Sequence, residues 1–259
     1  VFLGFRGAGT NHIVDVETCV VASPAIQAVL PSLRERLLEL GEGKGEVWLV
    51  SGGDEVAGSI EPEHQSKVAF GSKDVPVPVS DGHTLRAHPS LFVQANPHAV
   101  VDMSAHIEAL AREAGGKNAV ELFGGAGTFT LPLLKAGYSV QSYESNPSAQ
   151  SPYEELTSDL GEAQFKLCNL YKEREPVPAP SSVDLVLSDP PRTGASDLIP
   201  WVVQSKARTV IWIACDVATG LRDASLLIEQ GYELSSIRSF DMFPNTGHQE
   251  LIMHFVLAT

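Results

Sequence analysis

Short apolar segments alternate with longer amphipathic segments along the second half of the chain, and this alternation limits the folds available to it. Runs such as 118–124 and 209–215 have the length of strands, and longer amphipathic stretches with helical spacing separate them. Strands that alternate with helices build an α/β fold, with a mainly parallel sheet covered on both faces. Two further strand-like runs, 232–243 and 250–258, end the chain with no helix between them, which predicts one antiparallel strand.

Residues 1–88 follow a different pattern and predict a smaller α/β domain. Strands are expected at 1–6, 12–21, 46–50 and 55–61, with 67–72 as a candidate fifth, and a helix from Ser23-Pro24 to about Leu40. The prolines of 75–82 exclude a central strand there. We therefore place a domain boundary near this stretch and expect residues 89–259 to form the second domain.

Composition excludes several classes of protein. The 259 residues carry 18 basic and 32 acidic side chains, a net charge of −14, so neither half is a basic nucleic-acid-binding module. The sequence has no apolar run long enough to span a membrane, and Val1 and the residues after it do not show the basic-then-apolar pattern of a signal peptide. Three scattered cysteines, Cys19, Cys168 and Cys215, do not form a disulfide framework and favour a reducing cytoplasm. Because the chain starts at Val1 on a strand, we expect the first domain to be truncated.

A glycine-rich turn, ELFGGAGTF (121–129), follows a predicted strand and begins a helix. Its glycines let the backbone turn tightly and approach a ligand closely, but many nucleotide sites share this feature. Glu144 adds information, because an acidic residue about 20 residues further on suits the hydroxyls of a ribose. A solvated strand-end charge is an equally good interpretation of Glu144 alone. The turn and Glu144 together indicate an adenosine-containing cofactor, either a dinucleotide or S-adenosylmethionine.

The stretch SDPPRTG (188–194) discriminates between these cofactors. Asp189 ends a predicted strand, and two prolines stiffen the backbone directly after it. A rigid Asp-Pro-Pro holds polar groups against a planar base. Dehydrogenases do not need this arrangement, so the motif favours S-adenosylmethionine. A proline-stiffened surface turn is the alternative interpretation.

Two residues with reactive side chains lie near the ends of strands. Cys215 ends the apolar run 210–214, and Glu250 precedes the last apolar strand. A lone cysteine is usually a small buried hydrophobe, and a glutamate at a strand entry is usually an ordinary charge. Taken singly, both residues favour the structural interpretation.

Six stretches together resemble one family, the RNA 5-methyluridine methyltransferases that use S-adenosylmethionine. They are FVQANP, ELFGGAGTF, YESNP, SDPPRTG, IACDVATGLRD and DMFPNTGHQE. The resemblance covers about 90–259 strongly, and residues 1–88 are similar to the family's central domain with less specific motifs. It implies a Rossmann-like class I methyltransferase domain with a seven-stranded, mainly parallel sheet. It also implies an RNA substrate, either rRNA or tRNA. We further expect a cytoplasmic monomer that does not associate with membranes.

The family's roles transfer residue by residue to this sequence. The resemblance implies that Cys215 is the nucleophile, that Glu250 accepts a proton, and that Asp189 lies between the cofactor and the target base. It implies a cofactor site lined by Gln94, Phe123, Gly125, Thr128, Glu144, Asn169 and Asp189, with Asn169 standing where the family usually has Asp.

The chemistry explains these residue types. Carbon 5 of uracil is a weak nucleophile, and addition of a thiolate to carbon 6 gives an enolate that can attack the methyl group. The thiolate is the reactive form, so nearby positive charge should help, and Arg192 and Arg222 are the candidates. The target base must leave its stack to reach the cysteine.

Two departures from the family pattern carry further expectations. The family usually has Ser-Cys-Asn-Pro where this chain has Ala214-Cys215-Asp216-Val217, and a close, unpaired carboxylate at Asp216 would raise the thiol pKa. Many members also hold an iron–sulfur cluster with four cysteines. Cys19 stands at the place of the last ligand and the other three would precede Val1, so we expect no complete cluster and no other metal in this chain.

These departures leave a second function open. The chain could be a catalytically weakened RNA- or cofactor-binding member of the same fold. A methyltransferase of a small molecule or protein is disfavoured, because a Cys/Glu pair has no role in simple nitrogen or oxygen methylation.

Overall fold

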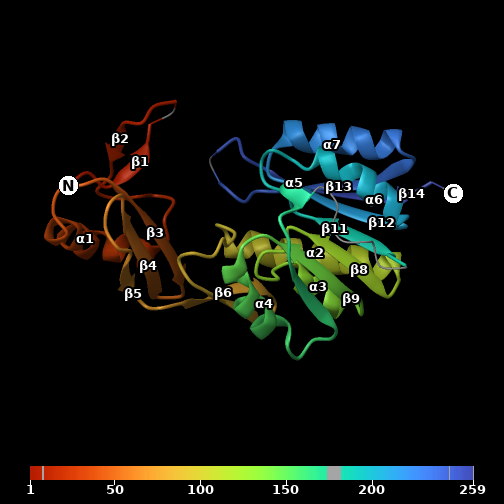
Figure 1. Ribbon diagram of the computed structural model, residues 1–259, viewed down its shortest axis with the longest axis horizontal. Helices are drawn as coiled ribbons and strands as arrows, with labels where there is room; N and C mark the ends of the chain where they lie inside the picture. Colours follow the sequence, from red (N-terminus) through yellow and green to blue (C-terminus); the bar gives the residue numbers. More distant parts are fainter. Residues whose placement is uncertain (8, 174–181, 245, 259) are drawn as a thin grey trace. The chain divides into compact units, whose positions relative to one another are not determined.

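The computed structural model describes residues 1–7, 9–173, 182–244 and 246–258. The chain divides into two compact units, one of Val1–Val77 with Arg86–Leu91 and one of Pro78–Leu85 with Phe92–Thr259 (Figure 1). The strands β6 (Val75–Ser80) and β7 (His83–Ala87) form a two-stranded sheet and contribute residues to both units.

The first unit combines a hairpin, one helix and a small antiparallel sheet. Its elements are β1 (Gly4–Arg6), β2 (Ile13–Asp15), α1 (Pro24–Glu39), β3 (Gly45–Gly52), β4 (Glu55–Pro62) and β5 (Val68–Gly71). As the sequence predicts, Ser23 caps α1 by accepting the Ile26 N–H, with Pro24 in the first turn. Strands β1 and β2 are shorter than predicted. Leu30 and Leu33 of α1 form a core cluster with Ile60 of β4.

The second unit is built on a seven-stranded sheet in the order β10-β9-β8-β11-β12-β14-β13. Its strands are β8 (Asn118–Leu122), β9 (Ser139–Glu144), β10 (Ala163–Leu167), β11 (Leu185–Ser188), β12 (Thr209–Ala214), β13 (Tyr232–Phe240) and β14 (Glu250–Leu257). The first five strands in this order are parallel, and β14 is antiparallel to both of its neighbours. The predicted fold class and the single antiparallel strand are confirmed.

Helices cover both faces of this sheet (Figure 1). They are α2 (Pro97–Ala114), α3 (Thr130–Lys135), α4 (Gln150–Thr157), α5 (Leu170–Glu173), α6 (Ile199–Ser205) and α7 (Val217–Glu229), with 3-10 turns at Pro147–Ala149 and Ser196–Leu198. Helix α2 packs against α3 on one face and α6 against α7 on the other. All six residues of β12 are buried, because its alternating side chains meet a helical layer on each side.

The strand order reverses between β8 and β11, which are adjacent in the sheet. From β8 the chain runs outward through β9 and β10, and then crosses back to β11. Ligands of such sheets bind beyond the carboxyl ends of the strands at this point. The backbone N–H of Asp189 donates to the Leu122 carbonyl over 3.3 Å there. The glycine-rich turn and Asp189 therefore begin side by side.

Candidate active site

The glycine-rich turn after β8 is closely supported on one side and open on the other. Phe123 begins it with a left-handed backbone (φ 63°). A Cβ on Gly124 would overlap the Ser142 Oγ and lie 2.7 Å from the Glu121 Oε2, so only glycine fits. A Cβ on Gly125 would meet no atom within 4 Å. The turn thus rests on buried polar side chains and leaves its other side free for a ligand.

Glu144 ends β9 and is fixed beside this turn. Its Oε2 accepts the Gly125 N–H at 3.0 Å, and its Oε1 accepts the N–H groups of Ser145 and Asn146, both at 2.6 Å. The carboxylate therefore has a defined orientation at the carboxyl edge of the sheet, which is the position predicted for a ribose contact.

The other predicted cofactor residues lie around the same edge. Thr128 follows the glycines and precedes α3, and Asn169 follows β10. The Asn169 Oδ1 accepts the Lys172 N–H at 3.1 Å, at the beginning of α5. The Phe123 ring lies 5.4 Å from the Tyr171 ring with a 40° tilt.

Tyr171 is a residue of this edge that the sequence does not identify. It lies in the charged, proline-rich stretch 171–182, which predicts a solvated loop; residues 174–181 of that stretch lie outside the described residues. The structure instead places Tyr171 in α5, with its ring beside Phe123. An aromatic residue just beyond the end of a strand was the available signal.

Asp189 lies between the turn and the last strands of the sheet. The Gln94 Nε2 donates to its Oδ2 over 3.3 Å, which brings the segment before α2 into the site. Desolvation, and then the charges of Glu250 and Glu121, raise the pKa of Asp189 to about 8. Its carboxyl group therefore holds a proton at neutral pH.

Cys215 and Glu250 come from neighbouring antiparallel strands. Ala214 of β12 pairs with Leu251 of β14, and Cys215 and Glu250 are the next residues at that end of the ladder. Cys215 is half-buried, whereas Glu250 is only 4% exposed. Among the described residues, the Glu250 Oε2 has no hydrogen-bond partner. Burial raises the pKa of Glu250 to about 7, although the charge of Arg192 opposes this shift.

The acidic neighbour of Cys215 does not act as the sequence suggests. Asp216 caps α7: its Oδ1 accepts the Thr219 N–H at 2.9 Å, and this bond is the main cause that lowers the pKa of Asp216. Burial raises the pKa of the Cys215 thiol, and the charges of Glu250 and Asp189 add to this effect. The expectation that Asp216 raises the thiol pKa required an unpaired carboxylate, and this one is paired.

The two candidate arginines behave differently. The charge of Arg192 lowers the pKa of Cys215, as predicted for a positive group near the thiol. Arg222 instead forms an ion pair with Asp223, 2.6 Å between Nη2 and Oδ1. Only Arg192 therefore contributes to the electrostatics of the thiol in the way that the sequence predicts for both.

Cys19 belongs to the first unit and lines a broad groove there of about 1640 Å³, together with apolar residues of α1 and β3. Its thiol is free and half-buried. In the described part of the chain, no group of three or more His, Cys, Asp or Glu side chains could hold a metal ion. Within the same ranges, no helix has the length and apolarity that a membrane crossing requires.

Sequence comparison relates the whole chain to rRNA methyltransferases. It is 32% identical over 285 residues to the 23S rRNA (uracil(1939)-C(5))-methyltransferase RlmD of Cronobacter sakazakii, with 98% of this chain and 66% of that protein covered. The enzyme of the same name from Tolumonas auensis is 27% identical, with 98% and 65% covered. The chain thus spans just under two thirds of these relatives. No protein-family model matches it.

Structural comparison finds the fold of this chain in other solved proteins. The tRNA (uracil-54, C5)-methyltransferase of Pyrococcus abyssi, in complex with S-adenosyl-L-homocysteine, superposes with a TM-score of 0.78 at 22% identity, covering 98% of this chain and 73% of that one. Trm5b of Pyrococcus abyssi superposes with a TM-score of 0.59 at 11% identity, covering 92% and 71%. The arrangement of strands and helices is therefore shared with both proteins.

Proposed function

The chain belongs to the family of RNA uracil-C5 methyltransferases, and on this premise we propose that it methylates carbon 5 of a uridine in RNA. One observation carries the proposal: Cys215 and Glu250 are the next residues beyond the Ala214–Leu251 pair, at the same end of the β12–β14 ladder. A thiol and a carboxylate are the nucleophile and the proton acceptor that this reaction needs.

The residues of the glycine-rich turn fit S-adenosylmethionine. Gly125 leaves one side of the turn open, and the Glu144 carboxylate stands at the neighbouring strand end, where it would bind the ribose hydroxyls. Phe123, Thr128 and Asn169 would border the adenosine. When bound, S-adenosylmethionine supplies an electrophilic methyl group on its sulfonium.

Cys215 begins the reaction. Its thiol gives its proton to water, Sγ bonds to carbon 6 of the uracil, and the electron pair of the C5–C6 double bond moves into an enolate. Carbon 5 would then bond to the methyl carbon while the bond from that carbon to the sulfonium breaks, and its electron pair would stay on the departing thioether sulfur. Glu250 removes the proton from carbon 5, the C6–Sγ bond breaks, the double bond forms again, and Cys215 leaves as a thiolate.

The protonation states of the two carboxyl groups suit this sequence of steps. With its pKa near 7, Glu250 is substantially ionised at neutral pH and is strong enough to accept a proton. Asp189, with its pKa near 8, is protonated and can donate a hydrogen bond to a uracil oxygen. The charge of Arg192 favours the thiolate form of Cys215.

The substrate that we propose is a uridine of rRNA or tRNA, since the compared proteins are named for these RNAs. The base would have to leave its stack to reach Cys215. We also propose that the protein acts as a monomer in the cytoplasm. Among the described residues its three cysteines form no disulfide, which supports a reducing compartment. Sizing of the purified protein by light scattering tests the monomer.

Incubation with S-adenosylmethionine and unmodified RNA, followed by mass spectrometry of the nucleosides, tests the activity. We expect 5-methyluridine from the wild-type protein and from Cys19→Ala, and none from Cys215→Ala. Undiminished product from Cys215→Ala would refute the assigned nucleophile. Cofactor binding without any product from the wild-type protein would support the weakened binding protein instead.

A further inference from the structure

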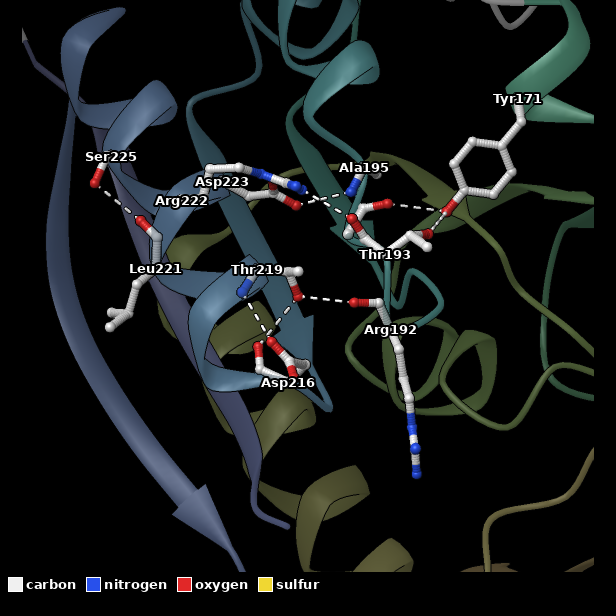
Figure 2. Close-up of polar contacts among 11 residues, drawn as sticks. Tyr171, Arg192, Thr193, Ala195, Asp216, Thr219, Leu221, Arg222, Asp223 and Ser225 are labelled. Atoms are coloured by element: carbon white, nitrogen blue, oxygen red, sulfur yellow. Dashed lines mark hydrogen bonds and ion pairs between the residues drawn. The ribbon is translucent and has the colours of Figure 1, made fainter. Parts of the chain in front are cut away.

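The segment Arg192–Ala195, which follows the two prolines after Asp189, is tied to α7 by three side chains (Figure 2). The Thr219 Oγ1 donates to the Arg192 carbonyl at 2.9 Å, and the Arg222 Nη2 donates to the Thr193 carbonyl at 2.9 Å. The Ala195 N–H donates to the Asp223 Oδ2 at 2.7 Å. We call this segment the strap.

A fourth side chain holds the strap from another helix. The Tyr171 hydroxyl, on α5, donates to the Gly194 carbonyl at 2.9 Å and lies 3.3 Å from the Thr193 Oγ1 (Figure 2). A backbone atom of every strap residue is therefore bonded to a side chain of α5 or α7. The Arg192 side chain extends away from these contacts.

The centre of the contact is buried and charged. Asp223 is fully buried, and its Oδ1 accepts from the Arg222 Nε at 2.9 Å and Nη2 at 2.6 Å, while Oδ2 accepts from the strap. A Cβ on Gly194 would overlap the Arg222 guanidinium and lie 2.5 Å from the Asp223 Oδ2. Glycine at this position allows the strap to approach the ion pair closely.

This contact joins the two halves of the candidate site. Two prolines separate Asp189 from the strap, and Cys215 directly precedes Asp216, the N-cap of the helix that holds the strap. Thr219 contacts both halves. Its N–H donates to the carboxylate of Asp216, beside Cys215, and its hydroxyl donates to the strap. A shift of the strap would change the placement of Asp189 and Arg192 relative to Cys215.

We propose that Thr219, Arg222 and Asp223 are positioning residues for the methyl transfer: they hold the strap on α7, so that Asp189 and Arg192 keep a fixed position relative to Cys215. This inference rests on the proposed function for its kinetic consequence. The spacing Thr-x-x-x-Asp from Thr219 to Asp223 has a physical reason on this account, because residues four apart lie on one face of a helix.

Thr219 offers a test with little risk to the fold. Thr219→Val removes the hydroxyl at nearly constant shape, and Thr219→Ser keeps it. We expect Thr219→Val to lower kcat about tenfold, as loss of one well-placed hydrogen bond would, while KM for RNA and the affinity for S-adenosylmethionine change less than about twofold. Thr219→Ser should restore most of kcat.

Ser225→Ala is the matched control. It removes a hydroxyl-to-carbonyl bond of 2.9 Å, from Ser225 to Leu221, on the same helix but away from the strap (Figure 2). We expect wild-type kcat from this variant. Asp223→Asn should lower kcat more than Thr219→Val, because an amide cannot accept at both the strap and Arg222.

A second readout does not depend on RNA. Burial and the neighbouring charges raise the pKa of Cys215, so iodoacetamide should alkylate it slowly at neutral pH. Burial is the largest cause of the raised pKa, so a loosened strap in Thr219→Val should expose the thiol and give faster alkylation with a midpoint at lower pH, although Arg192 would move as well. The rate is measured on the Cys215 peptide by mass spectrometry. Thr219→Ser and Ser225→Ala should keep the wild-type profile.

The outcomes separate the two proposals. A shifted alkylation profile in Thr219→Val, in a protein that methylates no RNA, would support the strap contact while refuting the proposed function. Active enzyme with unchanged kcat in Thr219→Val would overturn the positioning role. Equal losses of kcat in Thr219→Val, Thr219→Ser and Ser225→Ala would also overturn it, since they would indicate general destabilisation of α7.

Discussion

Glu250 stands one position beyond the Leu251–Ala214 pair of the β12–β14 ladder, at the end where Cys215 follows Ala214. The antiparallel direction of β14 therefore decides at which edge of the sheet Glu250 lies. In a fully parallel sheet the beginning of β14 would lie at the opposite edge from the end of β12. Here the beginning of one strand and the end of the other meet at the edge that also carries Asp189 and the glycine-rich turn.

The ionisation of Glu250 should control the pH dependence of kcat. Its pKa of about 7 exceeds the ordinary value of 4.5, and only its ionised form can be the proposed proton acceptor, so kcat should rise as pH increases through about 7. Glu250→Gln should lower kcat about a hundredfold or more. It should also accumulate a methylated covalent complex with RNA, seen as a slow band in denaturing electrophoresis. An unaltered pH–rate profile in Glu250→Gln would show that another group takes the proton.

Glu144 should contribute to binding of S-adenosylmethionine. Replacement by Gln removes the charge that favours two ribose hydroxyls, and it weakens the bond to the Gly125 N–H. We expect about tenfold weaker binding by isothermal titration calorimetry. Glu162→Gln, which alters a carboxylate bonded to Ser139 at the beginning of the same strand, is the control and should bind normally. Equal affinities of the two variants for S-adenosylmethionine would show that Glu144 does not contribute to the cofactor site.

Gly124 should be intolerant of a side chain because of what lies beneath it. Gly124→Ala would force its Cβ into the Ser142 Oγ, so we expect a loss of about 1–3 kcal/mol in the free energy of unfolding, measured in urea, and weaker cofactor binding. Ser142→Ala removes that oxygen. The double variant should therefore recover part of both losses, and simple addition of the two single effects would contradict this explanation.

Glu121 should make stability fall as pH rises. Burial raises its pKa from 4.5 to about 7, so between these values the folded protein holds a proton that the unfolded chain releases. This contribution is fully present below about pH 4.5 and is lost through about pH 7. Glu121→Gln cannot lose a proton. Its free energy of unfolding relative to wild type should therefore rise by about 3 kcal/mol between pH 4.5 and 7.5. A constant difference across this range would mean that Glu121 is ionised when buried.

The sequence predicts the second unit well, because its signals are local. Apolar runs, helical spacing and a glycine-rich turn are properties of neighbouring residues, and they locate β8, β12 and α7 correctly. The division between the two units is less simple than a cut after residue 88, because β6 and β7 contribute to both. The periodicity of apolar residues does not tell which unit each residue of a paired strand will pack against.

The contacts that long-range packing decides are not readable from the sequence. Ala195 and Asp223 are 28 residues apart, and nothing near either residue indicates that one accepts a hydrogen bond from the other. Asp216 reads as a charge beside a thiol, and only the geometry of the cap shows that α7 engages its carboxylate. The sequence suggests that Arg222 is a cation available to the thiol, but the side chain forms an ion pair with Asp223.

The most direct test of the account uses RNA in which the target uridine carries fluorine at carbon 5. Fluorine cannot leave as a proton, so the reaction should stop after methyl transfer with Cys215 still bonded to carbon 6. We predict an adduct that survives denaturation, forms only with S-adenosylmethionine present, maps to Cys215 by mass spectrometry, and is missing from Cys215→Ala. Methylation of natural RNA by a protein that forms no adduct at Cys215 would contradict the account.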